Sequence, residues 1–263
     1  MPLTQEQVEA LAEALWSAER DAAPIAPLTA QHPDLTVADA YAVQQALIRR
    51  KLAAGARVMG WKVGLTSTAM QRLLGVSEPD FGHLLDTMQL ADGSPLSRAA
   101  LIWPRVEPEI AFALGADLHG PGVTAADVLA ATAALIPALE VVDSRIRDWQ
   151  IRLADTIADN ASSARFVLGR GRVPPGDFDL RLLGMVFQVD GQVVATAAGA
   201  AVLGHPAQAV AWLANTLARF GQGLRAGQVV LPGSLVAAVD VQPGMTVTAE
   251  FDRLGAVTLH VTA

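Results

Sequence analysis

Residues 105–112 read RVEPEIAF, and this stretch decides how the rest of the chain is interpreted. Glu107 and Glu109 stand two residues apart, and side chains alternate between the two faces of a β-strand. Both carboxylates would therefore leave the same face, and the run from Ile110 to Leu114 is apolar. Adjacent carboxylates repel each other unless one is protonated or a cation neutralises them. Mg²⁺ and Mn²⁺ prefer oxygen ligands, so the pair is a candidate metal site.

A third acid, Glu140, lies in a second strand-like run, PALEVV, at residues 137–142. Apolar neighbours on both sides make this an unusual place for an unpaired acid. Three carboxylates from two strands would hold one metal ion and leave sites free for a chelating substrate. The alternative is that Glu107 and Glu109 line the wet face of a half-exposed sheet, and the spacing alone leaves this alternative open.

The composition predicts a globular protein with a substantial core. Hydrophobic residues make up 52% of the 263 residues and charged residues 17%. So little charge also leads us to expect buried subunit interfaces, as in a homo-oligomer. The formal net charge of -7 argues against a nucleic-acid partner, because binding phosphates needs a basic patch. The chain has no cysteine, which excludes disulfides, thiolate metal sites and thiol nucleophiles.

Neither a membrane partner nor a secretory leader is expected. No apolar run reaches the ~20 residues that span a bilayer. Residues 1–15 carry acids and lack a basic region before an apolar one, so they do not read as a signal peptide. A cytoplasmic location is therefore the expectation.

Helix signals fill the first part of the chain. Thr4 and Gln7 form a capping box for an amphipathic helix to about residue 20. Residues 23–35 hold three prolines and are expected to be a loop. Thr36 caps a second helix from residue 37 to about residue 54. We therefore expect residues 1–56 to form a helical N-terminal region and residues 57–263 to form the catalytic domain.

Residues 57–263 contain strands and helices that do not alternate regularly. Helices are expected at 125–135 and 206–220, with a short one ending near residue 75. Strands are expected at 57–65, 105–112, 137–142, 166–168, 185–189, 193–198, 228–231, 245–251 and 256–261, and a weak strand or a loop at 88–96. Asp190-Gly191 between two apolar runs predicts a hairpin. The irregular order argues against a doubly wound sheet and favours an α+β domain with a mostly antiparallel or mixed sheet.

A polar excursion lies between two apolar strands, at residues 143–163. It predicts a site-forming loop or short helix, the alternative being a solvated connection. Arg145 in this segment could bind a substrate carboxylate, or pair with Asp143 or Asp148. Ser162 and Ser163 could donate a hydrogen bond to a substrate oxygen. No histidine is placed to activate either of them as a nucleophile.

Two further residues could carry chemistry. Lys62 lies in an apolar strand, where a buried lysine can serve as an acid or base. The alternative is an edge-strand lysine that faces water. Asp80 follows a proline in a turn-rich loop, and could be a general base or a turn former. His83 and His205 are interpreted as loop or capping residues rather than metal ligands.

Taken in order, several segments resemble the 2-hydroxypenta-2,4-dienoate (2-keto-4-pentenoate) hydratases, which belong to the fumarylacetoacetate hydrolase superfamily. They are GWKVGLTS (60–67), LGVSEPDFGHL (74–84), VEPEIAF (106–112), GPGVTAADVLAAT (120–132), PALEVVDSRIRDW (137–149), DTIADNASS (155–163), LGHP (203–206) and GSLVAAVDVQPG (233–244). The resemblance runs from about residue 35 to the end of the chain. This many ordered matches are more specific than any single motif.

The resemblance implies an α+β fold of curved mixed β-sheets with a helical N-terminal part, assembled into a large homo-oligomer. It implies that Glu107, Glu109 and Glu140 bind Mg²⁺ or Mn²⁺. It also implies that Lys62 lies near the 2-oxygen of the substrate, and that Asp80 moves protons or positions water. One of the two serines of the polar segment would line the site.

The activity that the resemblance implies is addition of water to 2-hydroxypenta-2,4-dienoate in the meta-cleavage catabolism of aromatic compounds. The product would be 4-hydroxy-2-oxopentanoate. The nearest rival is a 2-oxo-3-hexenedioate (4-oxalocrotonate) decarboxylase, and a third candidate is a hydratase for longer or dicarboxylic dienoates. The absence of an insertion between Trp149 and Asp155 favours a short substrate. A catalytically silent oligomeric partner is the alternative from another class, and the complete set of acids with Lys62 argues against it.

Overall fold

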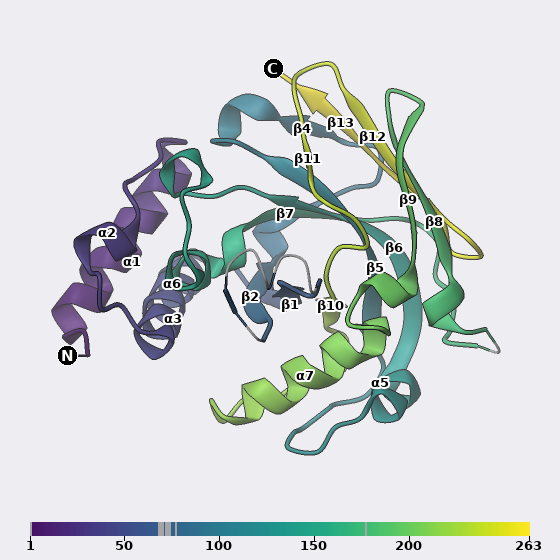
Figure 1. The fold of residues 1–263 in the computed structure, drawn as a ribbon, viewed down its shortest axis with the longest axis horizontal. Helices are drawn as coiled ribbons and strands as arrows, with labels where there is room; N and C mark the ends of the chain where they lie inside the picture. Colours follow the sequence, from purple (N-terminus) through teal and green to yellow (C-terminus); the bar gives the residue numbers. More distant parts are fainter. Residues whose placement is uncertain (1, 68–70, 72–74, 77, 177) are drawn as a thin grey trace.

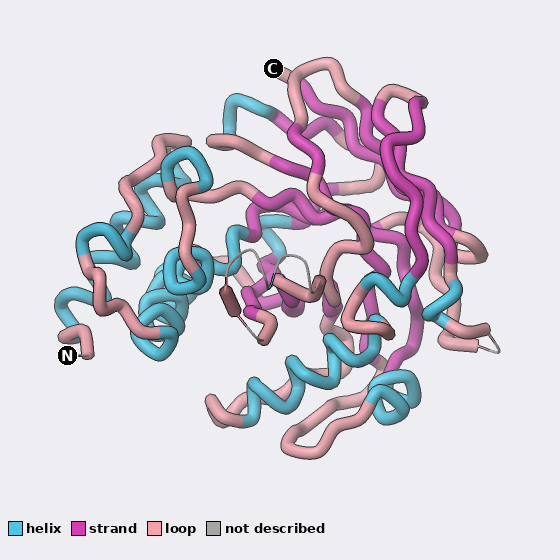
Figure 2. Tube along the Cα trace, viewed as in Figure 1, coloured by secondary structure: helices cyan, strands magenta, loops and turns pink. Residues whose placement is uncertain are grey.

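The computed structural model describes residues 2–67, 71, 75–76, 78–176 and 178–263. Two β-sheets form the centre and one side of the molecule, and helices cover the other side and the lower edge in Figure 1. Figure 2 shows the same division, with strands gathered in the middle and on the right. The short helix expected to end near residue 75 falls largely outside the described residues.

Three helices precede the first strand: α1 (Gln5–Arg20), α2 (Leu28–Gln31) and α3 (Val37–Ala53). The capping box predicted at the start of α1 is present, and Thr36 caps α3 as expected. The loop expected at 23–35 contains the single turn α2. This turn forms because the buried carboxylate of Asp155 accepts hydrogen bonds from Thr29 N at 2.9 Å and Thr29 Oγ1 at 2.7 Å.

The larger sheet has the strand order β2-β1-β10-β5-β6-β7-β3, with β11 paired to β5. Its strands are β1 (Val58–Gly64), β2 (Asp80–Leu85), β3 (Gln89–Leu90), β5 (Arg105–Leu114), β6 (Thr132–Val142), β7 (Ser163–Leu168), β10 (Val229–Leu231) and β11 (Val239–Asp240). The β1–β10 and β3–β7 pairs are parallel and the other pairs are antiparallel. The predicted mixed sheet is therefore confirmed.

The second sheet has the order β4-β13-β12-β8-β9. Its strands are β4 (Pro95–Ser97), β8 (Gly184–Val189), β9 (Gln192–Ala198), β12 (Thr246–Phe251) and β13 (Gly255–Thr262). Asp190 and Gly191 connect β8 to β9 with φ of 51° and 75°, which is the backbone of the predicted tight hairpin. The weak strand expected at 88–96 is split, since β3 joins the larger sheet and β4 joins this one.

The remaining helices are α5 (Ala125–Ala131), α6 (Leu153–Ala158) and α7 (Pro206–Ala218), and the single 3-10 turns are Asp86–Met88, Arg98–Ala100, Arg147–Trp149, Asn160–Ser162, Leu180–Leu182 and Gly199–Ala201. The helix expected at 125–135 was too long. It ends at Ala131, and β6 begins at Thr132, because Leu135 and Ala134 pair with β5. Strand pairing outweighs the weak local helix preference there.

A single hydrophobic cluster connects the N-terminal helices with both sheets. It includes Leu15 of α1, Leu47 of α3, Phe112 of β5 and Leu259 of β13. The division into residues 1–56 and residues 57–263 stays a prediction. Among the described residues, no helix has the length and apolar character that crossing a membrane requires.

Candidate metal centre and active site

Glu107 of β5 and Glu140 of β6 lie directly opposite each other across the antiparallel strand pair. Opposed residues leave the same face of a sheet, and Glu109 shares that face with Glu107. One oxygen from each of the three carboxylates can be chosen so that all three lie within 4.8 Å of one another. The structure therefore brings together the three acids that the sequence singles out.

These carboxylates are largely removed from water. Glu109 and Glu140 are each 0% exposed. Gly233 N donates to Glu109 Oε2 at 2.7 Å, whereas Glu109 Oε1 and Glu140 Oε1 accept no hydrogen bond from any described residue. Buried oxygens without a partner are costly, and oxygen-only donor sets are what small divalent cations prefer. The three glutamates fit a divalent cation.

Lys62 completes this cluster from β1. Its Nζ lies 3.2 Å from Glu140 Oε2 and donates to Ala161 O at 3.1 Å. The residue is 4% exposed. The alternative of an edge-strand lysine facing water is wrong, because β1 lies between β2 and β10 in the sheet.

Asp80 lies on the same face as Lys62. In the β1–β2 register Lys62 is opposite Gly82 and Gly64 is opposite Asp80, so Lys62 and Asp80 are diagonal neighbours. A Cβ on Gly64 would lie 2.2 Å from Asp80 Oδ1, so the missing side chain makes room for the carboxylate. Asp80 is a buried residue at the start of a strand rather than a turn former, and its Oδ1 accepts no hydrogen bond within the described chain.

Burial sets the protonation of the acids. It raises the pKa of Glu107 to about 7, with the negative charges of Glu140 and Asp80 adding to the effect and Lys62 opposing it. It also raises the pKa of Asp80, and the pKa of Glu109 well above its ordinary value. Burial alone would lower the pKa of Lys62, but the surrounding carboxylates outweigh it and keep the pKa above its ordinary value. A cation that enters this cluster would therefore displace protons.

Arg145 has its partners inside the protein. It is 1% exposed; its Nε donates to Asp159 Oδ1 at 2.5 Å, and its Nη1 donates to Ser163 O at 3.2 Å. The ion pair is with Asp159 and not with Asp143 or Asp148, the alternatives that the sequence offered, because α6 brings Asp159 back against the guanidinium. Nor does the structure support a substrate-binding role, since these buried contacts occupy the guanidinium. Arg145 instead connects the start of the polar segment to its end, through Asp159 and Ser163.

The end of the polar segment has an unusual backbone. Asn160, Ala161 and Ser162 have φ of 54°, 51° and 55°, a region that residues other than glycine adopt infrequently. The Ser162 hydroxyl lies 3.4 Å from Thr156 Oγ1. The Ser163 hydroxyl is buried and has no hydrogen-bond partner among the described residues, so of the two it is the one still free to bind a ligand.

Three contributors to the site were missed in the sequence. Asp159 and Asn160 lie within the polar segment that the sequence did single out, but nothing local distinguishes them from their neighbours. Gly233 donates its backbone N–H to Glu109, and a backbone contact of this kind has no signal in the side-chain sequence. His83 was interpreted as a loop or capping residue and is instead a buried strand residue whose ring lies 4.2 Å from that of Trp61.

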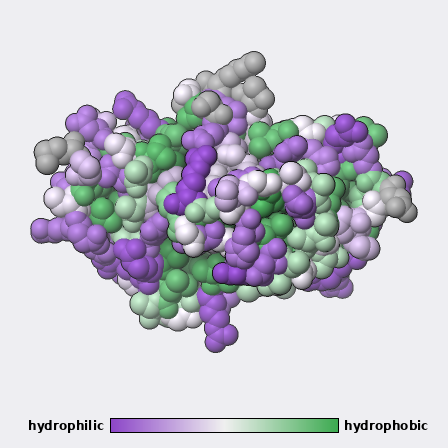
Figure 3. Space-filling model, turned by 90° about the horizontal axis from the view of Figure 1, so that it is seen from below, coloured by the Kyte–Doolittle hydropathy of each residue, from purple (hydrophilic) through white to green (hydrophobic). Residues whose placement is uncertain are grey.

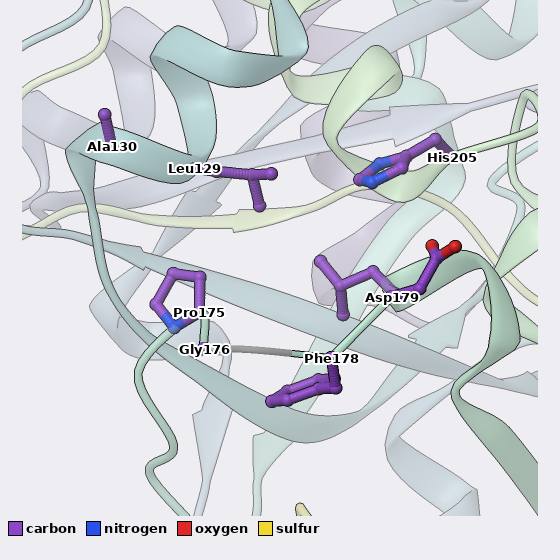
Figure 4. Close-up of a pocket in the computed structure, with 8 residues that line it drawn as sticks. Leu129, Ala130, Pro175, Gly176, Phe178, Asp179 and His205 are labelled. Carbon is purple, nitrogen blue, oxygen red and sulfur yellow. The ribbon is translucent and has the colours of Figure 1, made fainter.

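A cavity of about 440 Å³ lies elsewhere, between α5 and residues 175–176 and 178–180 (Figure 4). His205 and Asp179 are the titratable residues that line it. His205 Nδ1 accepts from Ala207 N at 3.1 Å and so caps α7, as predicted, while Asp179 is paired with Arg181. None of the predicted site residues lines this cavity, and we do not assign the chemistry to it.

Comparison with known proteins decides the family. The family model described as fumarylacetoacetate (FAA) hydrolase C-terminal matches residues 74–262. The chain belongs to the fumarylacetoacetate hydrolase family. This confirms what the ordered segments predicted.

Three relatives of this family member are enzymes of two kinds. The 2-hydroxyhexa-2,4-dienoate hydratase of Comamonas testosteroni is 46% identical over 97% of this chain and 97% of its own length. The 2-keto-4-pentenoate hydratase of Paraburkholderia xenovorans is 46% identical, with 97% and 95% covered. The 4-oxalocrotonate decarboxylase of a Pseudomonas strain is also 46% identical, with 96% of each chain covered. The prediction that this chain is an enzyme is confirmed.

Solved structures confirm the fold class. The 4-oxalocrotonate decarboxylase from Pseudomonas putida G7, complexed with magnesium and adipate, superposes with a TM-score of 0.96 at 43% identity over 98% of both chains. Fumarylpyruvate hydrolase from Pseudomonas aeruginosa, in complex with Mn²⁺ and pyruvate, gives a TM-score of 0.62 at 20% identity over 77% of this chain and 88% of its own. The second likeness concerns the fold alone. This family member thus has the expected α+β fold of curved mixed sheets.

Proposed function

We propose that this protein is a metal-dependent hydratase that converts 2-hydroxypenta-2,4-dienoate and water into 4-hydroxy-2-oxopentanoate. The observation that carries the proposal is the buried cluster of three glutamates with Lys62 Nζ 3.2 Å from Glu140 Oε2. It offers a cation site beside an N–H donor, which suits a substrate that chelates through its carboxylate and 2-oxygen. The hydratase names of two relatives support the reaction type.

The metal would be Mg²⁺ or Mn²⁺, held by Glu107, Glu109 and Glu140. When bound, such a cation withdraws electron density from the carboxylate and 2-oxygen of the substrate. The oxygen-only donor set and the partnerless oxygens of Glu109 and Glu140 support this choice. A relative of 43% identity has been solved with magnesium and with calcium, which also supports an oxygen-liganded cation.

The chain's own residues would handle the protons. Lys62 would donate an N–H to the 2-oxygen and stabilise the negative charge that develops there. Asp80, whose pKa burial raises, would take the proton of the 2-hydroxyl and deliver a proton to C5, giving the 2-oxo-3-enoate.

Addition of water would follow on this intermediate. C4 is now the electrophilic end of a conjugated system. The Asp80 carboxylate would accept a proton as the water oxygen bonds to C4, and that proton would pass to C3 as the product forms. The sum is one water gained, with no oxidant or reductant consumed. Ser163, whose buried hydroxyl is partnerless among the described residues, would donate to a substrate oxygen.

A decarboxylase acting on 2-oxo-3-hexenedioate is the second candidate, and the TM-score of 0.96 to such an enzyme favours it. That substrate has a second carboxylate, and proteins usually bind a carboxylate with an arginine or lysine side chain that has no other partner. Arg145, the arginine buried in the polar segment, is already paired with Asp159. This pairing leaves Arg145 unavailable for a second carboxylate. A hydratase for a longer or dicarboxylic dienoate remains the third candidate.

The test is absorbance decay of 2-hydroxypenta-2,4-dienoate with and without Mg²⁺, with mass detection of the product. Mg²⁺-dependent gain of one water is the expected result. No reaction with this substrate, together with release of carbon dioxide from 2-oxo-3-hexenedioate, would overturn the hydratase proposal in favour of the decarboxylase.

We also propose that the protein works as a homo-oligomer in the cytoplasm. Val193 and Val194 of the edge strand β9 are 60% and 49% exposed. Edge strands with exposed apolar residues favour self-association. Figure 3 shows hydrophobic side chains interspersed among hydrophilic ones over the face seen from below, rather than a uniformly polar surface. Light scattering coupled to gel filtration would measure the mass, and a monomer would refute the assembly.

A further inference from the structure

Asn160 joins the polar segment to strand β2 with both ends of its side-chain amide. Oδ1 accepts from His83 N at 2.7 Å, and Nδ2 donates to His83 O at 2.9 Å. The residue is 1% exposed. The amide thus pairs with β2 as the backbone of a neighbouring strand would, which fixes both the distance and the direction of approach.

The backbone of the same residue lies against a position with no side chain. A Cβ on Gly82 would lie 2.4 Å from Asn160 O. Gly82 is also the residue opposite Lys62 in the β1–β2 register. The segment therefore lies close to the strand pair beside Lys62, and only glycine at position 82 permits this approach.

Beside Lys62, the polar segment exposes the backbone carbonyl of Ala161 to the ammonium group. Ala161 O accepts from Lys62 Nζ at 3.1 Å, and this is the hydrogen bond by which the segment holds the ammonium. Asn160 and Ala161 both have positive φ, a conformation that costs energy unless its surroundings fix it. The hydrogen bonds between Asn160 and His83 hold this backbone conformation on one side, and the Arg145–Asp159 ion pair holds it on the other.

We propose that Asn160 is a positioning residue, which acts through the Ala161 carbonyl to aim the ammonium of Lys62. This inference rests on the proposed function and deepens it. An ammonium has three N–H donors in fixed relative directions. Ala161 O accepts one of them, and Glu140 Oε2 lies 3.2 Å from Nζ on the other side, so the position of the carbonyl sets how the ammonium sits against the face that carries the glutamates. Without Asn160 the carbonyl would move, and the ammonium would turn toward the carboxylates.

The experiment measures hydrogen–deuterium exchange at C3 of 2-oxopentanoate in D₂O with Mg²⁺, followed by proton NMR. In this reaction the cation site and Lys62 would stabilise the enolate, so Lys62→Met should slow the exchange without abolishing it; neither hydration nor decarboxylation is required. Asn160→Ala should slow the exchange by about 100-fold, the loss typical of misplacing a catalytic group by about 1 Å. Its affinity for Mg²⁺, measured by calorimetry, should stay that of the wild type. Gly82→Ala, which displaces the Asn160 carbonyl without removing the amide, should give a similar loss.

Two comparisons separate positioning from general stability. Gln44 is a buried amide that also links β2 to α6, since its Nε2 donates to Phe81 O at 2.9 Å and Ile157 O at 2.8 Å. Gln44→Ala should lower the midpoint of thermal unfolding but keep most of the exchange rate. In a Lys62→Met background, Asn160→Ala should cause no further loss, because its effect passes through Lys62.

Additive losses in the double variant, or an equal loss in Gln44→Ala, would overturn the positioning role. If the alanine variant does not fold, Asn160→Asp carries the test, because it keeps the acceptor for His83 N and loses the donor. A wild type that exchanges C3 protons but neither hydrates the dienoate nor decarboxylates the hexenedioate would refute the proposed function while leaving this inference in place. A wild type that hydrates the dienoate but does not exchange C3 protons would overturn this inference and leave the proposed function in place.

Discussion

Lys62 Nζ lies 3.2 Å from Glu140 Oε2, and both side chains are removed from water. Lys62 also faces the charges of Glu107, Glu109 and Asp80, which together keep the pKa of its ammonium raised in spite of burial. A buried ion pair is costly to assemble, but removing one partner is costlier, because the other charge is left without compensation. Lys62 is therefore the cation that holds the acid cluster together.

Replacing Lys62 by methionine should expose this role. We expect Lys62→Met to lose about 3–5 kcal/mol in free energy of unfolding without metal, the usual cost of breaking a buried pair. The gain on adding Mg²⁺ should exceed that of the wild type, because the cation then relieves the uncompensated acids. Urea unfolding with and without Mg²⁺ measures both quantities. Lys51→Met breaks the largely buried pair with Glu19 and is the control, in which Mg²⁺ should restore nothing extra. Equal Mg²⁺-dependent gains in the two variants would contradict the prediction.

Glu109→Gln should separate chemistry from stability. Glutamine keeps an oxygen that can accept from Gly233 N but removes one buried negative charge. Mg²⁺-dependent turnover should fall by about a thousandfold or more, since a neutral amide is a poor ligand for a hard cation. The metal-free variant should be no less stable than the wild type, because burial opposes ionisation of Glu109. Turnover and calorimetric Mg²⁺ affinity are the measurements.

The control for this variant is Glu250→Gln on strand β12. Glu250 is an exposed carboxylate that accepts from Gln188 Nε2 at 3.0 Å. Its replacement should change neither turnover nor affinity for Mg²⁺. Wild-type turnover in Glu109→Gln would remove the metal-site proposal.

The pH dependence of stability should carry a contribution from His83. Burial lowers the pKa of His83 to about 4, whereas an unfolded histidine titrates near 6.5. Between these values the unfolded chain binds a proton that the folded protein does not, so this contribution is present above pH 6.5 and is lost as the pH falls toward 4. The shift corresponds to about 3 kcal/mol.

His83→Phe keeps a ring on Trp61 and removes the titration. Its free energy of unfolding, relative to the wild type, should therefore rise as the pH falls from 7 to about 4.5. Urea unfolding at several pH values measures the difference. A constant difference between His83→Phe and the wild type would show that His83 does not titrate as its burial requires.

The three glutamates could be predicted because strand periodicity is local. Two residues of separation put Glu107 and Glu109 on one face, and an acid within an apolar run indicated Glu140. Their convergence depends on the β5–β6 register, which the apolar pattern of both strands favours. The resemblance to a family then supplied the roles that spacing alone left open.

The burial of Lys62 could not be read from its neighbours in sequence. It requires β10, from residues 229–231, and β2 on either side of β1, and strand order is not a local property. The partner of Arg145 was missed because helix α6 brings Asp159 back against it, a turn of the chain that the local pattern does not indicate. Asn160 lies within the segment that the sequence indicates as polar, but its role depends on a left-handed backbone conformation. Asparagine can adopt this conformation but often does not, so the sequence alone does not predict it. The β6 strand replaced the end of an expected helix because its pairing partner lies outside the local window.

Gly64→Ala tests whether Asp80 needs the room that glycine leaves. The new Cβ would lie 2.2 Å from Asp80 Oδ1, and the carboxylate would have to swing away from its place beside Lys62. We expect turnover to fall by about 100-fold, as for other small displacements of a catalytic group. Affinity for Mg²⁺ should stay unchanged, because the glutamates belong to β5 and β6. Gly184→Ala is the matched control, since its Cβ meets nothing within 4 Å and its φ is not positive, and it should keep full turnover. If Gly64→Ala retains wild-type turnover while binding Mg²⁺ normally, Asp80 does not move the protons, and another group must carry them.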